Sequence, residues 1–129
     1  LGGQVEVLPF IHNMAERLAE CDLIICRAGA ITASELCAAG VPSILVPLVV
    51  STTAHQRDNA IYMAKHGAAI HLPQGDLTPG TLAEQLSRMN RDELMAMAQR
   101  ARALARPRAA AAVADDLERL SLNKKGAAR

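Results

Sequence analysis

The fold is decided by the stretch LIICRAGAITASELCAAGVPSILVP, which covers residues 23–47. Its two ends, residues 23–26 and 43–46, are continuous apolar runs of strand length, as is typical of strands buried on both faces of a sheet. Between them lie a loop of small residues and a segment from 32 to 39 that reads as a helix closed by Gly40. A strand, a helix and a second strand in this order predict a parallel pair with a right-handed crossover.

The alternation of strands and helices continues on both sides of this stretch. Upstream, we expect a strand at residues 5–8 and then a helix that runs to about Cys21, capped by Asn13 with Glu16 as the partner in a capping box. Downstream, the expected elements are a helix at 55–66, a strand at 69–72, helices that begin at Thr78 and at Asn90, and a last helix at 109–120 before a frayed tail.

The fold class that follows is α/β, with a Rossmann-like parallel sheet and helices on both faces. The chain has 129 residues, which suits one domain, and a formal net charge of +1. Its longest apolar run, residues 41–50, is interrupted by prolines and is shorter than the roughly 20 residues that cross a bilayer. With one Phe, one Tyr and no Trp, the chain has few side chains for stacking on bases, so we expect no nucleic-acid partner.

Metal and disulfide chemistry are not predicted. The three cysteines, Cys21, Cys26 and Cys37, have no C-x-x-C spacing and lie among apolar residues, so we interpret them as buried, reduced thiols of a cytosolic protein. The four histidines have no metal-ligand spacing, and no Asp-x-Asp occurs. We therefore expect neither a metal nor another cofactor.

A group of arginines late in the chain allows two interpretations. In the first, these side chains contact an acidic surface or anionic lipid. In the second, they belong to a solvated helix end, where cations interact favourably with the negative end of the helix dipole. The residues are Arg100, Arg102, Arg106 and Arg108. The second interpretation is favoured.

Ligands of open α/β sheets bind beyond the carboxyl ends of the strands, which directs attention to the loops at 9–13, 27–32 and 47–56. The second loop joins a buried strand to a helix start through small residues, where backbone amides and the helix dipole favour phosphate oxygens. It has neither the G-x-G-x-x-G pattern nor the lysine of a P-loop, so an anion would be held by the backbone.

Two sets of polar residues near these loops also have alternative roles. The spacing of Thr32 and Glu35 fits a capping box, which spacing alone favours over a carboxylate that accepts hydrogen bonds from the hydroxyls of a ribose. His55 and Gln56, with Asn59 beyond them, read as a hydrogen-bonding surface rather than as a general acid or base.

Five motifs with specific gaps resemble one known family. They are FI-x-x-M at 10–14, RAGAITASE at 27–35, G-x-PSILVP at 40–47, HQ-x-x-NA at 55–60 and GAA at 67–69. This series resembles the MurG family, bacterial transferases of peptidoglycan synthesis that add N-acetylglucosamine to undecaprenyl-pyrophosphoryl-N-acetylmuramyl-pentapeptide. The resemblance extends from about Val5 to Leu120.

The resemblance implies that residues 1–129 are the UDP-sugar-binding, C-terminal domain of a two-domain GT-B glycosyltransferase, incomplete at its N-terminal side. The acceptor-binding domain and a loop of the Gly-Gly-Ser-Gln-Gly type are absent. The implied activity is inverting, metal-independent transfer by a hexosyltransferase. The general base is expected on the absent domain, so the catalytic residue is unknown and the chain alone is expected to be inactive.

The resemblance also assigns donor-binding roles. The backbone of Ile11 would pair with the uracil edge, Glu35 would bind the ribose hydroxyls, which reverses the preference for a cap, and Gln56 with His55 would contact the sugar. The amides at residues 30–32 would bind the diphosphate. The implied set is Ile11, Met14, Ala30, Ile31, Thr32, Ala33, Ser34, Glu35, His55 and Gln56.

The implied partners are UDP-N-acetylglucosamine and, through the absent domain, the lipid-linked muramyl-pentapeptide acceptor. The implied location is peripheral, on the cytoplasmic side of the bacterial inner membrane, in a protein of cell-wall synthesis, cell shape and division. The alternatives are the donor-binding subunit of a split, two-chain N-acetylglucosamine transferase, part of a UDP-sugar epimerase, and an α/β domain without a ligand.

Overall fold

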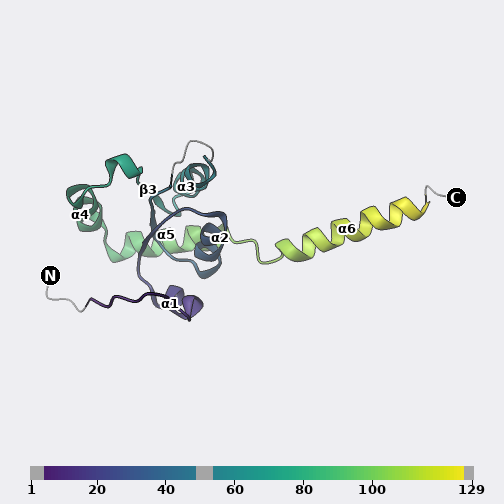
Figure 1. The fold of residues 1–129 in the computed structure, drawn as a ribbon, viewed down its shortest axis with the longest axis horizontal. Helices are drawn as coiled ribbons and strands as arrows, with labels where there is room; N and C mark the ends of the chain where they lie inside the picture. Colours follow the sequence, from purple (N-terminus) through teal and green to yellow (C-terminus); the bar gives the residue numbers. More distant parts are fainter. Residues whose placement is uncertain (1–4, 49–53, 127–129) are drawn as a thin grey trace.

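The computed structural model describes residues 5–48 and 54–126. Its strands are β1 (Ile24–Cys26), β2 (Ser43–Leu45) and β3 (Ile70–His71). Its helices are α1 (Met14–Glu20), α2 (Ala30–Ala39), α3 (His55–Lys65), the short 3-10 helix η1 (Gln74–Asp76), α4 (Pro79–Arg88), α5 (Arg91–Ala103) and α6 (Ala109–Gly126) (Figure 1).

The described strands form one parallel sheet in the order β1-β2-β3. Ile25 lies opposite Ile44 in the first pair of strands, and Leu45 lies opposite His71 in the second. α2 connects the first pair and α3 precedes the third strand, so each connection is a helical crossover. The predicted α/β class with a parallel sheet is confirmed.

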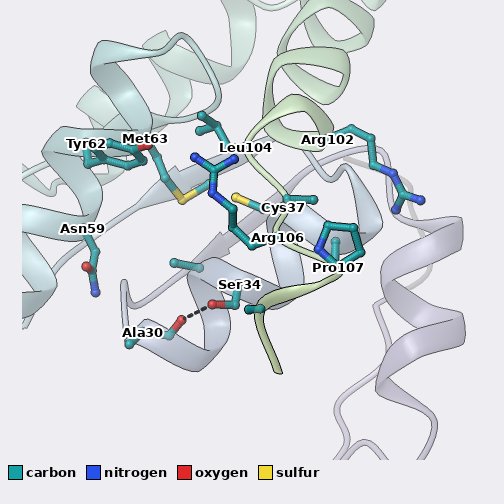
Figure 2. A pocket seen from close by; sticks show the side chains of 14 residues that line it. Ala30, Ser34, Cys37, Asn59, Tyr62, Met63, Arg102, Leu104, Arg106 and Pro107 are labelled. Carbon is teal, nitrogen blue, oxygen red and sulfur yellow. Dashed lines mark hydrogen bonds between the residues drawn. The ribbon is translucent and has the colours of Figure 1, made fainter. Parts of the chain in front are cut away.

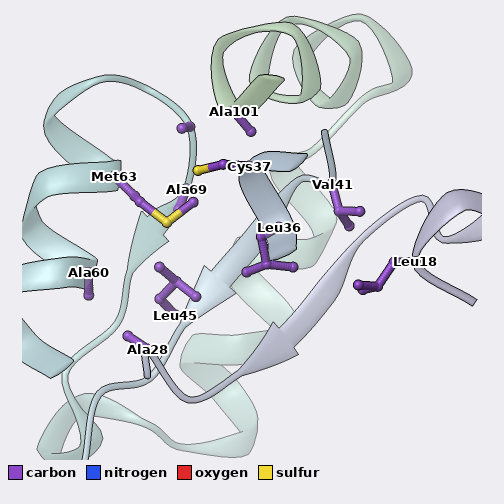
Figure 3. Packing of buried hydrophobic residues seen from close by; sticks show 11 residues of the cluster. Leu18, Ala28, Leu36, Cys37, Val41, Leu45, Ala60, Met63, Ala69 and Ala101 are labelled. Carbon is purple, nitrogen blue, oxygen red and sulfur yellow. The ribbon is translucent and has the colours of Figure 1, made fainter. Parts of the chain in front are cut away.

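Most of the core lies between one face of the sheet and three helices. Leu45 of β2 packs there with Leu36 of α2, Met63 of α3 and Ala101 of α5, and all four are buried (Figure 3). A smaller cluster on the other face joins Ile44, Val46 and Leu72 to Leu82 of α4 and to Met89. Because successive residues of a strand point to opposite faces, β2 is buried on both sides, as its apolar run predicts.

Two expectations at the N-terminal side are wrong. Residues 5–8 pair with no strand in the described part of the chain, and Val5 and Val7 are each 87% exposed, because an alternating segment becomes a strand only beside a hydrogen-bonding neighbour. β1 is not buried on both faces, since Ile25 is 43% exposed. Ile25 lies opposite Ile44 and faces the side of the smaller cluster, but it is not part of that cluster, so the α4 side of the core does not cover β1.

The helices agree with the predicted pattern except at their ends. Asn90 and Glu93 form the expected capping box at the start of α5, whereas the Asn13 side chain donates to the Glu16 carboxylate (2.8 Å) instead of capping α1. The predicted frayed tail is wrong up to Gly126, because no glycine or proline interrupts the sequence before that residue. α6 extends away from the other elements (Figure 1).

Candidate functional site

The start of α2 is the centre of the candidate site. The chain leaves β1 at Cys26, and α2 begins at Ala30 with Gly29 as the N-cap residue. The first helical hydrogen bond runs from the amide of Ala33 to the carbonyl of Gly29 (2.9 Å). The amides of residues 30–32 therefore have no partner within the helix and lie at the positive end of its dipole, where an anion is stabilised.

The predicted capping box of Thr32 and Glu35 is wrong. α2 begins two residues earlier than the sequence pattern indicates, so Thr32 is the third residue of the helix and not its cap. No side-chain hydrogen bond caps this helix. Gly29 is the N-cap in an extended conformation (φ −60°, ψ 152°), and glycine is about as common as threonine at this position.

The exposed side of α2 carries the other residues expected to contact a nucleotide. Ala30, Ile31, Ser34 and Glu35 line one shallow, open hollow of about 430 Å³. Glu35 is exposed there, and Ile31 is 77% exposed. The hydroxyl of Ser34 donates to the carbonyl of Ala30 (2.9 Å), so it remains available to a ligand only as an acceptor. Of the donor-binding residues that the resemblance implies on α2, the hollow thus joins Ala30, Ile31, Ser34 and Glu35, whereas Thr32 and Ala33 do not line it.

The start of α3 lies next to the loop at 27–29. The side-chain amide of Asn59 donates to the carbonyl of Ala28 (3.0 Å), and Oε1 of Gln56 accepts from the amide of Leu48 (2.9 Å). His55 is exposed. Gln56 therefore offers a sugar its amino group and the second lone pair of Oε1, and part of its role is to hold the chain after β2. Residues 49–53 of the predicted third loop lie outside the described residues.

Arg27 and Gln74 form a bridge that sequence reasoning missed. Nη1 of Arg27 donates to the carbonyl of Val46 (3.2 Å) and to Oε1 of Gln74 (2.7 Å). The position of Arg27 directly after a buried strand was visible in the sequence, but its partners come from segments 19 and 47 residues away. No local pattern joins such distant segments.

A cavity of about 830 Å³ lies between α2, α3 and the chain that follows α5 (Figure 2). Ala33 and Cys37 line it from α2, Asn59 and Met63 line it from α3, and Arg106 closes another side. Burial raises the pKa of the Cys37 thiol, an effect that the nearby Arg106 partly opposes. A protonated thiol is a poor nucleophile, so Cys37 is a packing residue.

The remaining predicted residues lie apart from these hollows. Ile11 precedes α1 and is half-buried, and Met14 is the first residue of α1, which packs against α2. The three cysteines are free, and only Cys37 is buried, so the expected burial is wrong for Cys21 and Cys26. Arg100 and Arg102 lie in the last turn of α5, as the helix-end interpretation predicts, whereas Arg106 and Arg108 lie between α5 and α6.

The described residues contain neither a cluster of metal ligands nor a helix suited to span a membrane. Among residues 5–48 and 54–126, no group of three or more His, Cys, Asp or Glu side chains is placed to hold a metal ion. None of the helices in these ranges combines the length and apolarity that crossing a membrane requires.

Comparison with known proteins gives a consistent result. A family model described as the glycosyltransferase family 28 C-terminal domain matches residues 1–117. Proteins of Methylibium petroleiphilum and Chromobacterium violaceum are 71% and 65% identical to the chain, over 116 and 118 residues. Both carry the name UDP-N-acetylglucosamine–N-acetylmuramyl-(pentapeptide) pyrophosphoryl-undecaprenol N-acetylglucosamine transferase.

The match covers 90% and 92% of this chain but 32% and 33% of those two proteins. The chain therefore spans about a third of the length of these relatives. The crystal structure of Acinetobacter baumannii MurG is 43% identical with a TM-score of 0.85, over 90% of this chain and 35% of that one. A glycotransferase of kitacinnamycin, 21% identical with a TM-score of 0.55 over 76% of this chain and 26% of its own, shares the fold.

Proposed function

The chain belongs to the glycosyltransferase family 28 C-terminal domain family, and from this we propose that it is the UDP-N-acetylglucosamine-binding part of an inverting N-acetylglucosaminyltransferase. The acceptor proposed is the lipid-linked muramyl-pentapeptide, bound by a domain outside this chain. The observation that carries the proposal is the start of α2: the amides of residues 30–32 have no partner within the helix, and the exposed Glu35 lines one hollow with Ala30 and Ile31.

Each part of a UDP-sugar has a chemically suitable partner in this arrangement. The diphosphate would accept hydrogen bonds from the amides of residues 30–32. One helical turn further on, Glu35 would accept hydrogen bonds from the ribose hydroxyls. The uracil would face the backbone of Ile11, with Met14 beside it, and the sugar would lie towards His55 and the amino group of Gln56.

The proposed reaction needs a stabilised leaving group. A hydroxyl oxygen of the acceptor forms a bond to the anomeric carbon while the bond from that carbon to the diphosphate oxygen breaks, and the acceptor proton passes to a base outside this chain. Negative charge grows on the diphosphate during this step. Amides fixed before the reaction stabilise that charge without reorganisation, so we propose that the donor is bound without a metal or another cofactor.

We also propose that the enzyme is a peripheral protein on the cytoplasmic face of the inner membrane. The acceptor named for the relatives is attached to undecaprenol, a lipid, so the enzyme must work at a membrane surface. The name of these relatives also supports a transferase over the epimerase alternative, and it supports a role in cell-wall synthesis.

The proposal is tested with the full-length protein that carries this sequence. Purified enzyme is incubated with radiolabelled UDP-N-acetylglucosamine and the lipid-linked acceptor, with and without EDTA. Transfer of label that requires the acceptor and is unchanged by EDTA is expected. Epimerised nucleotide sugar formed without acceptor would instead establish the epimerase alternative, and activity restored only by a second chain would establish the split transferase.

A further inference from the structure

A single guanidinium joins the ends of all three described strands. Arg27 follows β1 directly, Val46 follows β2, and Gln74 opens η1, shortly after β3. Nη1 of Arg27 donates to the Val46 carbonyl (3.2 Å) and to Oε1 of Gln74 (2.7 Å). The backbone supports the same junction, because the amide of Val46 donates to the carbonyl of Cys26 (2.9 Å).

The junction lies at the base of the proposed diphosphate site. Arg27 is followed by Ala28 and then by Gly29, the N-cap residue of α2. The loop at 27–29 has a second anchor, the hydrogen bond from Asn59 to the carbonyl of Ala28. The direction in which the first amides of α2 point is therefore set from two sides, by α3 and by the Arg27 side chain.

Of the two partners of Arg27, only Gln74 is a side chain. The residue Arg27 is exposed, so its long side chain has many rotamers open to it unless an acceptor fixes the guanidinium. The Gln74 oxygen is the nearer acceptor, and a charge-assisted bond of this kind is stronger than a neutral one. Arg27 retains further N–H donors on Nη2 and Nε, and its positive charge lies at the same edge as the α2 amides.

We propose that Gln74 is a positioning residue of the diphosphate subsite. By accepting the hydrogen bond from Arg27, it holds the guanidinium against the Val46 carbonyl, and it thereby fixes both the loop at 27–29 and a positive charge beside the α2 amides. This inference rests on the proposed function, because it assumes that a nucleoside diphosphate binds there.

The test uses the full-length enzyme and three variants. Gln74→Ala removes the acceptor, Gln74→Glu keeps an acceptor oxygen for Arg27, and Gln99→Ala is the matched control on the exposed side of α5. UDP and uridine are each titrated by competition against labelled donor. Gln74→Ala is expected to weaken UDP binding by about threefold to tenfold while uridine binding stays within about twofold, because uridine has no diphosphate to position.

Partial recovery is expected in Gln74→Glu, whose carboxylate holds Arg27 but offsets its charge beside the diphosphate, and no change is expected in Gln99→Ala. In steady-state kinetics, KM for the donor should rise in Gln74→Ala and kcat should fall, because the positioned amides also stabilise the charge that grows on the diphosphate. Equal losses of UDP and uridine affinity, together with a lower melting temperature, would overturn the inference in favour of a purely structural role. Unchanged UDP affinity in Gln74→Ala would overturn it directly, whereas a wild-type enzyme that binds no UDP would refute the proposed function itself.

Discussion

Asn59, one turn into α3, donates a hydrogen bond to the backbone carbonyl of Ala28, which lies 31 residues earlier in the chain (3.0 Å). Ala28 is fully buried. The bond therefore gives a hydrogen-bond partner to a buried carbonyl in the loop between β1 and α2. It also links the two helices whose first turns form the candidate site.

Replacing Asn59 with Asp should destabilise the chain. The change keeps the shape of the side chain but replaces the donor with a second acceptor, so the Ala28 carbonyl loses its partner and faces a carboxylate. We expect a loss of about 1–3 kcal/mol in the free energy of unfolding, measured by urea denaturation. Asn13→Ala removes an exposed bond to Glu16 and should cost less. A variant Asn59→Asp as stable as the wild type would show that water replaces the bond.

Gly40 and Gly75 make a matched pair for a test of backbone strain. Gly40 ends α2 in the left-handed conformation (φ 72°), and a Cβ there would lie 3.4 Å from both the carbonyl oxygen of Ala98 and the Cβ of Arg102. Gly75 has no positive φ, and nothing lies within 4 Å of a Cβ placed there. Gly40→Ala should lower the free energy of unfolding by about 1–2 kcal/mol, while Gly75→Ala should leave it within about 0.5 kcal/mol. Equal effects would argue that α2 ends differently in solution.

Helices and strands could be predicted where a local sequence pattern marks them. The apolar run of β2, the capping box at Asn90 and the stop at Gly40 are local features, and each is where the sequence indicates. The strand expected at 5–8 failed because a strand depends on a neighbour that local sequence cannot supply. The start of α2 was misplaced because Thr32 and Glu35 have the spacing of a capping box, whereas Gly29 has no side chain that could form one.

The same distinction between local and distant contacts applies to the candidate site. The proximity of the amides of residues 30–32 to Glu35 could be predicted, because these positions lie within six residues of one helix start, whereas their roles in donor binding stay predictions. The bridge from Arg27 to Gln74 was not, since it exists only once three strands are side by side. The hydrogen bond from Asn59 to Ala28 could not be predicted from the sequence either, although Asn59 belongs to one of the motifs.

Glu35→Gln should separate donor binding from helix stability. The carboxylate takes part in no capping box, so the free energy of unfolding should change by no more than about 0.5 kcal/mol. Loss of charge-assisted bonds to the ribose should raise KM for UDP-N-acetylglucosamine at least about tenfold in the full-length enzyme.

The contrasting variant is Glu93→Ala, because Glu93 accepts a hydrogen bond from the amide of Asn90 in a formed capping box (3.2 Å). It should lower the stability by about 0.5–1 kcal/mol and leave KM for the donor unchanged. An unchanged KM in Glu35→Gln would remove Glu35 from the donor site.

Residues 1–129 alone should show no transferase activity. The chain spans about a third of the length of its relatives, and the proposed acceptor site and general base lie outside it. The measurement is transfer of radiolabelled N-acetylglucosamine to the lipid-linked acceptor by the purified chain, beside the full-length enzyme at equal concentration. Turnover by the chain comparable to that of the full-length enzyme would mean that the catalytic base lies within these residues.

The nucleobase preference tests the proposed uracil contact. Ile11 lies before α1, and neither its amide nor its carbonyl has a backbone partner among the described residues. An amide donor and a carbonyl acceptor match O4 and N3–H of uracil, whereas cytosine presents an amino group and an unprotonated N3 at the same positions. Each mismatched buried group costs about 1–3 kcal/mol, so UDP should bind the full-length enzyme at least about tenfold more tightly than CDP.

The side chain of Ile11 should not influence this preference, because the contact is made by the backbone. Ile11→Val should therefore keep the ratio of UDP to CDP affinity within about twofold, even if the smaller side chain weakens both nucleotides through lost packing. Calorimetric titration of both nucleotides into the wild type and the variant measures the ratio. Equal affinities for UDP and CDP in the wild type would place the base-reading contact elsewhere. A ratio that collapses in Ile11→Val would assign it to the side chain instead of the backbone.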